Sequence, residues 1–108
     1  MKKTIPFKVQ VGPYRYSIKI VNPNQLPELS DYGAADHHTL EIRLREGLCA
    51  DQMKVTLLHE IMHCCSRVTF DYSTASDVSE ETWISFTSPT LYGTIRDNPI
   101  VRKFLFGD

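Results

Sequence analysis

The sequence predicts an α+β fold, in which a small, mostly antiparallel sheet of three to four strands packs against helices. Two observations support this prediction: apolar and polar residues alternate over much of the first 45 residues, and apolar residues then recur at helical spacing. Strands followed by helices are typical of folds in which the helices cover one face of a sheet. A chain of 108 residues has room for one domain, which we expect to span residues 1–108.

The first two strands are expected over residues 5–11 and 14–21. Apolar and polar side chains alternate in both segments, and Gly12-Pro13 separates them, which predicts a β-hairpin with one buried face. Residues 22–30 contain two prolines and two asparagines and are expected to form a loop. A short strand is expected within residues 31–36.

A further strand is expected over residues 39–45. Apolar residues alternate there with Glu and Arg, which predicts one buried face and one charged, solvated face. The charged pattern would also suit a strand at the edge of the sheet.

A long helix is expected from Asp51, a candidate N-cap, to about Arg67, because this stretch contains neither Gly nor Pro. Its apolar residues recur at helical spacing on two neighbouring stripes, so we expect the helix to be largely buried. The stripes consist of Val55, Leu58 and Met62, and of Leu57 and Ile61.

A second helix is expected after Ser79, a candidate N-cap, with two glutamates in the first turn, where acidic side chains interact favourably with the helix dipole. Pro89 lies inside this helix and is expected to kink it. Asp97-Asn98-Pro99 is expected to end it, and residues 100–106 to form a short apolar helix. The inward-facing stripe of the second helix comprises Trp83, Ile84, Thr87 and Leu91.

Residues 59–63 read His-Glu-Ile-Met-His and are the strongest functional signal in the sequence. Two histidines four residues apart on a helix share one face, so the ring nitrogens of His59 and His63 can reach one metal ion. Glu60 directly follows the first histidine and points to the side of this site, where it can bond a metal-bound water. The pattern is typical of catalytic zinc.

A catalytic zinc site requires a third protein ligand and one open position. The acidic candidates downstream are Glu80, Glu81, Asp71 and Asp77. We expect Glu80 to be the third ligand, because it opens the second helix and shares a face with Trp83. Glu81 is rotated away by one position.

Two other interpretations of these residues remain open. The histidines can be ordinary core or boundary residues, with Glu60 a solvated acid. Alternatively, a structural zinc site can involve Cys64 and Cys65, although a helix does not place both beside the two histidines. Three cysteines, an odd number, do not form a disulfide framework, which favours reduced thiols.

The strand at residues 39–44, the segment Thr56–His63 and the acid that opens the next helix resemble the ImmA/IrrE-type metallopeptidases, and more broadly the small gluzincins encoded by phages, mobile elements and bacteria. The resemblance covers roughly residues 30–95. It implies a zincin-like fold, with an active-site helix and a third-ligand helix packed on the sheet. The chain departs from the family at Met62, which stands where a glycine is usual, and in being very short.

This resemblance implies Zn²⁺ as cofactor, His59, His63 and Glu80 as its ligands, and Glu60 as general base. The expected function is therefore zinc-dependent hydrolysis of peptide bonds in a protein or peptide substrate, through metal-activated water. The substrate is expected to lie extended beside the strand at residues 39–45. Candidates for stabilising the oxyanion are His37, His38, Tyr32 and Tyr72.

A second functional hypothesis is a zincin-like domain that binds or regulates without catalysis, such as a phage protein that engages a host factor. Such a module would require a regulatory protein partner. A net charge of -1 makes nucleic-acid binding by a basic surface an unlikely function.

The N-terminal residues do not resemble a signal peptide, because Pro6, Lys8 and Gln10 interrupt the apolar run. No stretch approaches the ~18 consecutive apolar residues of a membrane span. We therefore expect the protein in the cytoplasm, of a bacterial cell or a phage-infected host.

Overall fold

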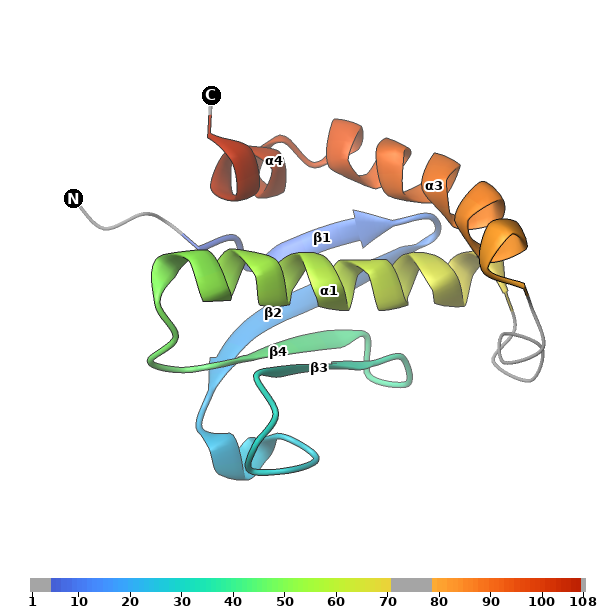
Figure 1. Ribbon diagram of the computed structural model, residues 1–108. Coiled ribbons are helices and arrows are strands. Elements are labelled where there is room, and N and C mark those ends of the chain that lie inside the picture. Colours follow the sequence, from blue (N-terminus) through green and yellow to red (C-terminus); the bar gives the residue numbers. More distant parts are fainter. Residues whose placement is uncertain (1–4, 71–78, 108) are drawn as a thin grey trace.

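The computed structural model describes residues 5–70 and 79–107 (Figure 1). The α+β class predicted from the sequence is confirmed. The elements are β1 (Lys8–Val11), β2 (Tyr14–Val21), the short 3₁₀ helix η1 (Pro23–Gln25), β3 (Gly33–Asp36), β4 (Glu41–Arg45), α1 (Ala50–Thr69), α3 (Glu80–Asp97) and α4 (Pro99–Phe106).

The strands form one sheet in the order β1-β2-β4-β3. β1 and β2 pair antiparallel as the predicted hairpin, and β3 pairs antiparallel with β4. β2 and β4 run parallel, with Ile18 opposite Ile42, so the sheet is mixed. The short strand expected within residues 31–36 is β3, and it lies at the edge of the sheet.

The suggestion that residues 39–45 form an edge strand is wrong, since β4 has a neighbour on each side. Its charged face is also less solvated than expected, because the charges are paired. Glu41 contacts Nζ of Lys19 at 2.7 Å and Nε of Arg43 at 2.6 Å. Arg45 donates to the carbonyl oxygen of Leu29 at 2.8 Å. These bonds allow charged side chains on an interior strand.

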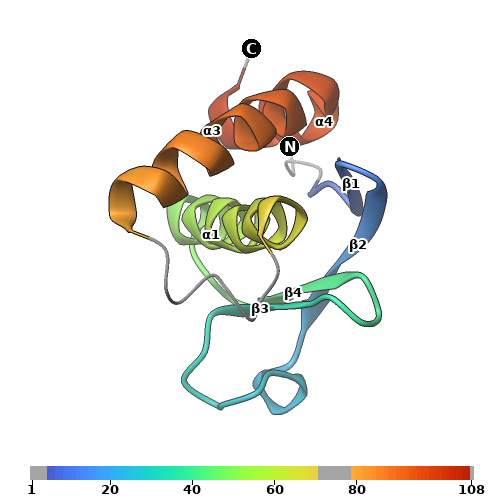
Figure 2. The same cartoon turned by 90° about the vertical axis from the view of Figure 1, so that its right-hand side faces the viewer.

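One face of the sheet packs against α1 to form the core. The fully buried side chains include Val9, Val11, Tyr16, Ile42 and Leu44 from the strands, and Leu57, Ile61, Cys64 and Cys65 from α1. Figure 2 shows the twisted sheet curving around one side of α1, with α3 and α4 on the opposite side.

Two details of the long helix differ from the prediction. Cys49, not Asp51, is the N-cap, and Asp51 lies in the first turn, where its charge favours the helix dipole. The stripe through Val55 does not face the core: Val55 is 61% exposed, and the buried stripe passes through Leu57 and Ile61. The sheet covers only one of the two apolar stripes that the sequence offered.

The C-terminal helices close the other side of α1. Ser79 caps α3 as predicted, accepting a hydrogen bond from the backbone N–H of Thr82 at 3.2 Å. The indole Nε1 of Trp83 donates to Oγ of Ser66 on α1 at 3.1 Å. At the predicted break between α3 and α4, the amide of Asn98 donates to the carbonyl of Gln10 at 2.8 Å and so joins this junction to β1. In the described part of the chain, no helix is long and apolar enough to cross a membrane.

Candidate metal centre

His59 and His63 lie on α1, as predicted, and both side chains are exposed. Their Nε2 atoms are 3.1 Å apart. Two nitrogens bound at ~2.0–2.1 Å to one tetrahedral ion would lie ~3.3 Å apart. The histidine pair therefore fits a single zinc ion with little adjustment of either ring.

The surroundings of His63 favour the state of the ring that binds a metal. Burial, followed by the neighbouring His59, lowers the pKa of His63. A neutral imidazole has a lone pair available for coordination, whereas an imidazolium does not. The surroundings of His63 therefore favour the neutral, metal-binding form of its ring.

Glu60 lies next to His59 in sequence but points toward the sheet, where it is only 6% exposed. Burial raises the pKa of its carboxyl group, His59 lowers it, and Asp31 raises it further. Among the described residues, no side chain or backbone group is hydrogen-bonded to this carboxylate. Its oxygens are not fully enclosed and open into the pocket described below, while the burial of the rest of the side chain disfavours the charged form.

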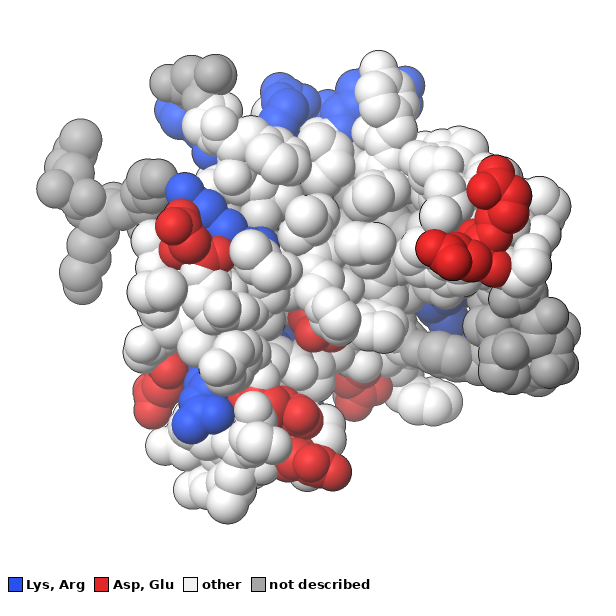
Figure 3. Space-filling model, viewed as in Figure 1, with Lys and Arg blue, Asp and Glu red and all other residues white. Residues whose placement is uncertain are grey.

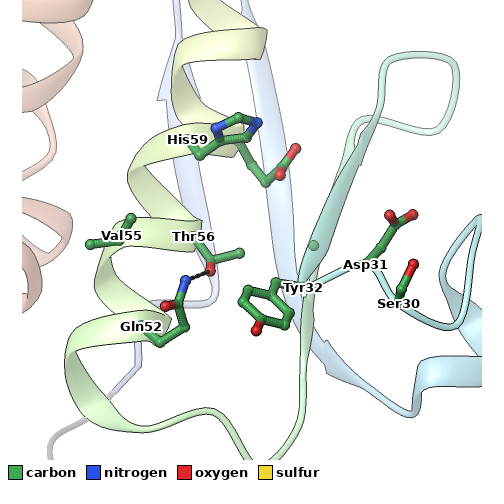
Figure 4. Close-up of a pocket in the computed structure, with 9 residues that line it drawn as sticks. Ser30, Asp31, Tyr32, Gln52, Val55, Thr56 and His59 are labelled. Atoms are coloured by element: carbon green, nitrogen blue, oxygen red, sulfur yellow. Dashed lines mark hydrogen bonds between the residues drawn. The ribbon is translucent and has the colours of Figure 1, made fainter.

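Glu60 and His59 line a pocket of about 380 Å³ between α1 and the chain that leads into β3. Figure 4 shows Tyr32 and Asp31 on the β3 side of this pocket, and Gln52, Thr56 and His59 on the helix side. The full lining consists of Ser30, Asp31, Tyr32, Gly33, Gln52, Val55, Thr56, His59 and Glu60. His59 thus joins the histidine pair to a polar pocket.

Gly33 allows α1 to approach β3 closely enough to build this pocket. A Cβ atom at this position would lie 2.8 Å from Cγ2 of Thr56, 3.0 Å from the carbonyl oxygen of Arg43 and 3.4 Å from Cγ of Glu60. The sequence analysis did not identify Gly33 or Asp31 as site residues. A glycine inside a strand often marks a close approach of another backbone or a ligand, and that signal was present at Gly33.

The free edge of β3 runs alongside the site. The N–H of Arg45 donates to the carbonyl oxygen of Tyr32 at 2.8 Å, so Tyr32 directs its main-chain groups toward β4. In an antiparallel pair this direction alternates, and the main-chain groups of Gly33 and Ala35 therefore point away from β4. The expectation that a substrate pairs with residues 39–45 is wrong, because both edges of β4 are already bonded.

The structure does not bring Glu80 or Glu81 to the histidine pair. Both lie exposed in the first turn of α3. Within residues 5–70 and 79–107, no group of three or more His, Cys, Asp or Glu side chains is arranged to hold a metal ion. Asp71 and Asp77, the other candidates, lie outside the described residues. The third ligand stays a prediction.

The remaining candidates from the sequence fall in different places. Cys64 and Cys65 are buried in the core, away from the exposed histidines. Of the candidates for oxyanion stabilisation, Tyr32 lines the pocket, and His37 is hydrogen-bonded through Nδ1 to the hydroxyl of the buried Tyr16 at 2.7 Å. His38 is exposed, and Tyr72 lies outside the described residues.

Comparison with known proteins adds no identification. No protein-family model matches the chain, and no curated protein or solved structure matches it significantly.

Proposed function

We propose that the protein is a zinc-dependent peptidase. One observation carries the proposal: two exposed histidines have Nε2 atoms 3.1 Å apart, and one of them, His59, lines a pocket together with the carboxylate of Glu60. Metal ligands, a candidate base and a cavity for substrate therefore meet on one face of α1. The zincin-like arrangement and the family resemblance belong to this proposal.

His59 and His63 would hold Zn²⁺, with Glu80 as the predicted third ligand. The ion would supply a Lewis acid that polarises the scissile carbonyl and lowers the pKa of water toward ~7. The histidines would contribute by presenting their two Nε2 atoms, 3.1 Å apart, from one face of a helix that packs on the core.

Glu60 would serve as the general base. Its carboxylate accepts a proton from water and then donates it to the leaving amine. Because burial raises its pKa, this carboxylate is a stronger base than a solvated glutamate. Without a hydrogen-bond partner in the described part of the chain, it is free to bond the attacking water.

The substrate would lie extended along the free edge of β3. Main-chain groups of Gly33 and Ala35 point toward this edge and can pair with a peptide, as in strand addition to a sheet. β3 consists of Gly, Ala, Ala and Asp, so small side chains let a peptide approach both the strand and the histidine pair.

The test combines metal analysis with hydrolysis of an unfolded protein. We expect purified protein to contain about one zinc per chain, and His63→Ala to lose both zinc and hydrolysis because half of the histidine pair is gone. Cys49→Ser is the matched control, since it removes an exposed thiol, another potential zinc ligand, at the opposite end of α1. Protein that binds no zinc, or a Cys49→Ser variant that loses it, would contradict the proposed site.

A zincin-like module that binds or regulates without hydrolysis gives a different result. In that case zinc is retained, and Glu60→Gln keeps the full biological effect of the protein. A cytoplasmic location is part of the proposal and is checked by fractionating cells that express the chain.

A further inference from the structure

The pocket beside His59 is acidic. Two of its lining residues are acids, Asp31 and Glu60, and no Lys or Arg is among the described residues that line it. Figure 3 shows several acidic side chains over the lower part of this face, with one basic side chain beside them, whereas many of the Lys and Arg side chains lie along its upper rim. A positively charged group is the complementary occupant.

Asp31 is held in place by the turn that precedes β3. Its backbone N–H donates to the carbonyl of Glu28 at 3.0 Å, and the N–H of Glu28 donates to its Oδ2 at 3.1 Å. One carboxylate oxygen is therefore anchored. The other, Oδ1, has no hydrogen-bond partner among the described residues and can accept a bond from a ligand.

A second observation independently indicates a ligand. The side chain of Glu60 is 6% exposed, and its carboxylate lines the same pocket without a hydrogen-bond partner in the described part of the chain. A carboxylate that opens into a pocket without a protein partner can bond a molecule bound there. Asp31 and Glu60 line this pocket from opposite walls, the chain before β3 and α1.

We propose that this pocket accepts a Lys or Arg side chain of the peptide that lies along β3, and that Asp31 determines the preference. The inference rests on the proposed function for its peptide ligand. Asp31 and Tyr32 form one wall of the pocket, and Gly33 directly follows them in the chain. The main-chain groups of Gly33 point to the free edge of β3. A peptide paired with Gly33 therefore places a side chain at the mouth of the pocket. A volume of about 380 Å³ lies at the lower end of the range of roughly 300–1,000 Å³ for small-ligand pockets, which suits one long side chain.

The position of Asp31 would keep the charged end of the Lys or Arg side chain away from a zinc ion held by His59 and His63. Asp31 belongs to the β3 side of the pocket and His59 to the helix side (Figure 4). A Lys or Arg side chain carries its charge at the end of a flexible apolar stem, so the charged group can reach Oδ1 of Asp31 while the peptide backbone stays on the strand edge.

The experiment measures binding and cleavage separately, on the purified full chain. The probes are blocked, fluorescently labelled peptides of one sequence that differ at a single central position, which is Lys, Arg, Leu or Glu. Anisotropy gives the affinity of each peptide, and mass spectrometry of the same samples gives cleavage. We expect the Lys and Arg peptides to bind at least about tenfold more tightly than the Leu and Glu peptides, as a charge-assisted hydrogen bond supports.

Asp31→Asn should reduce this preference to nearly equal binding, while its amide oxygen still accepts the bond from Glu28. Asp31→Lys should reverse the preference in favour of the Glu peptide. Glu28→Gln is the matched control, because it removes a nearby exposed carboxylate that does not line the pocket, and we expect it to keep the wild-type ratio.

Equal binding of the four peptides by the wild-type protein, or a preference that survives Asp31→Asn, would overturn the inference. A preference that depends on Asp31 without any cleavage would support this inference and contradict the proposed peptidase. Cleavage of the four peptides without any preference among them would support the proposed peptidase and contradict this inference.

Discussion

Two polar clusters are buried where α1 meets the strands, and they differ in how they are bonded. In the first, the hydroxyl of Tyr16 is hydrogen-bonded to Nδ1 of His37 at 2.7 Å and also interacts with the thiol of Cys64. In the second, Cγ of Glu60 lies against Gly33, and the carboxylate has no hydrogen-bond partner in the described part of the chain. Both clusters lie on the sheet side of α1.

The bonded cluster has the properties of a structural element. Tyr16 and Cys64 are fully buried, and burial raises the pKa of Cys64 to about 12, so its thiol stays protonated and unreactive. Glu60 has the opposite properties, since a carboxylate without a partner stabilises nothing in the free protein. Under the proposed function, the first cluster supports the fold and the second serves a ligand or a reaction.

The strongest test of this comparison is Glu60→Gln, which we expect to reduce hydrolysis by about 100-fold or more, as removal of a general base does. The free energy of unfolding should be unchanged or higher, because the amide replaces a buried charge of nearly the same shape. Hydrolysis of an unfolded protein and urea denaturation measure the two effects. A marked loss of stability would show that Glu60 is structural and would remove the contrast with Tyr16.

Gly33→Ala comes next, because it tests whether the pocket depends on the close approach of α1 to β3. The new Cβ would lie 3.0 Å from the carbonyl of Arg43 and 2.8 Å from Thr56, so helix and strand must separate. We expect a loss of stability of about 1–3 kcal/mol from overpacking, together with reduced hydrolysis because Glu60 moves.

Gly93→Ala on α3 is the matched control for that substitution. Its Cβ would meet only the end of the Arg96 side chain, at 3.9 Å, so it should raise stability by roughly 0.5–1 kcal/mol through helix propensity. Equal effects of the two variants would argue against a special role for Gly33.

Tyr16→Phe tests the bonded cluster. The change leaves Nδ1 of His37 without the hydroxyl, which we expect to lower the free energy of unfolding by about 1–2 kcal/mol. Zinc content and hydrolysis should remain close to those of the wild type. Tyr14→Phe, at a partly exposed position, should change stability by less than about 0.5 kcal/mol. Loss of zinc in Tyr16→Phe would mean that the two clusters are coupled.

The sequence predicted much of what this comparison uses, and the missing parts are those that depend on tertiary neighbours. The period of the apolar residues located the hairpin, β4 and α1, because that period reports local geometry. It did not show that β4 is an interior strand, since the alternation within one strand is independent of what pairs with it. Nor did it show which stripe of α1 is buried: the helix was expected to be largely buried on both stripes, but Val55 is 61% exposed.

The candidate site was likewise predicted only in the part that local spacing along one helix determines. The spacing of His59 and His63 determines that they share a helix face, and the structure places their Nε2 atoms 3.1 Å apart. Asp31 and Gly33 could not be assigned from spacing, because they reach the site through the packing of β3 on α1. The third ligand depends on how α3 is placed relative to α1, which no local pattern encodes.

The smallest expected effect concerns a neutral group that also lacks a partner. The hydroxyl of Thr87 on α3 is buried and has no hydrogen bond within the described residues. Thr87→Val replaces it with a methyl group of similar size, so we expect stability to rise by up to about 1 kcal/mol with hydrolysis unchanged. Urea denaturation measures the gain. If Thr87→Val instead reduced hydrolysis as Glu60→Gln is expected to do, an unbonded buried group would not by itself distinguish functional from structural positions. With hydrolysis unchanged, the distinguishing property of Glu60 is its charge beside the histidine pair.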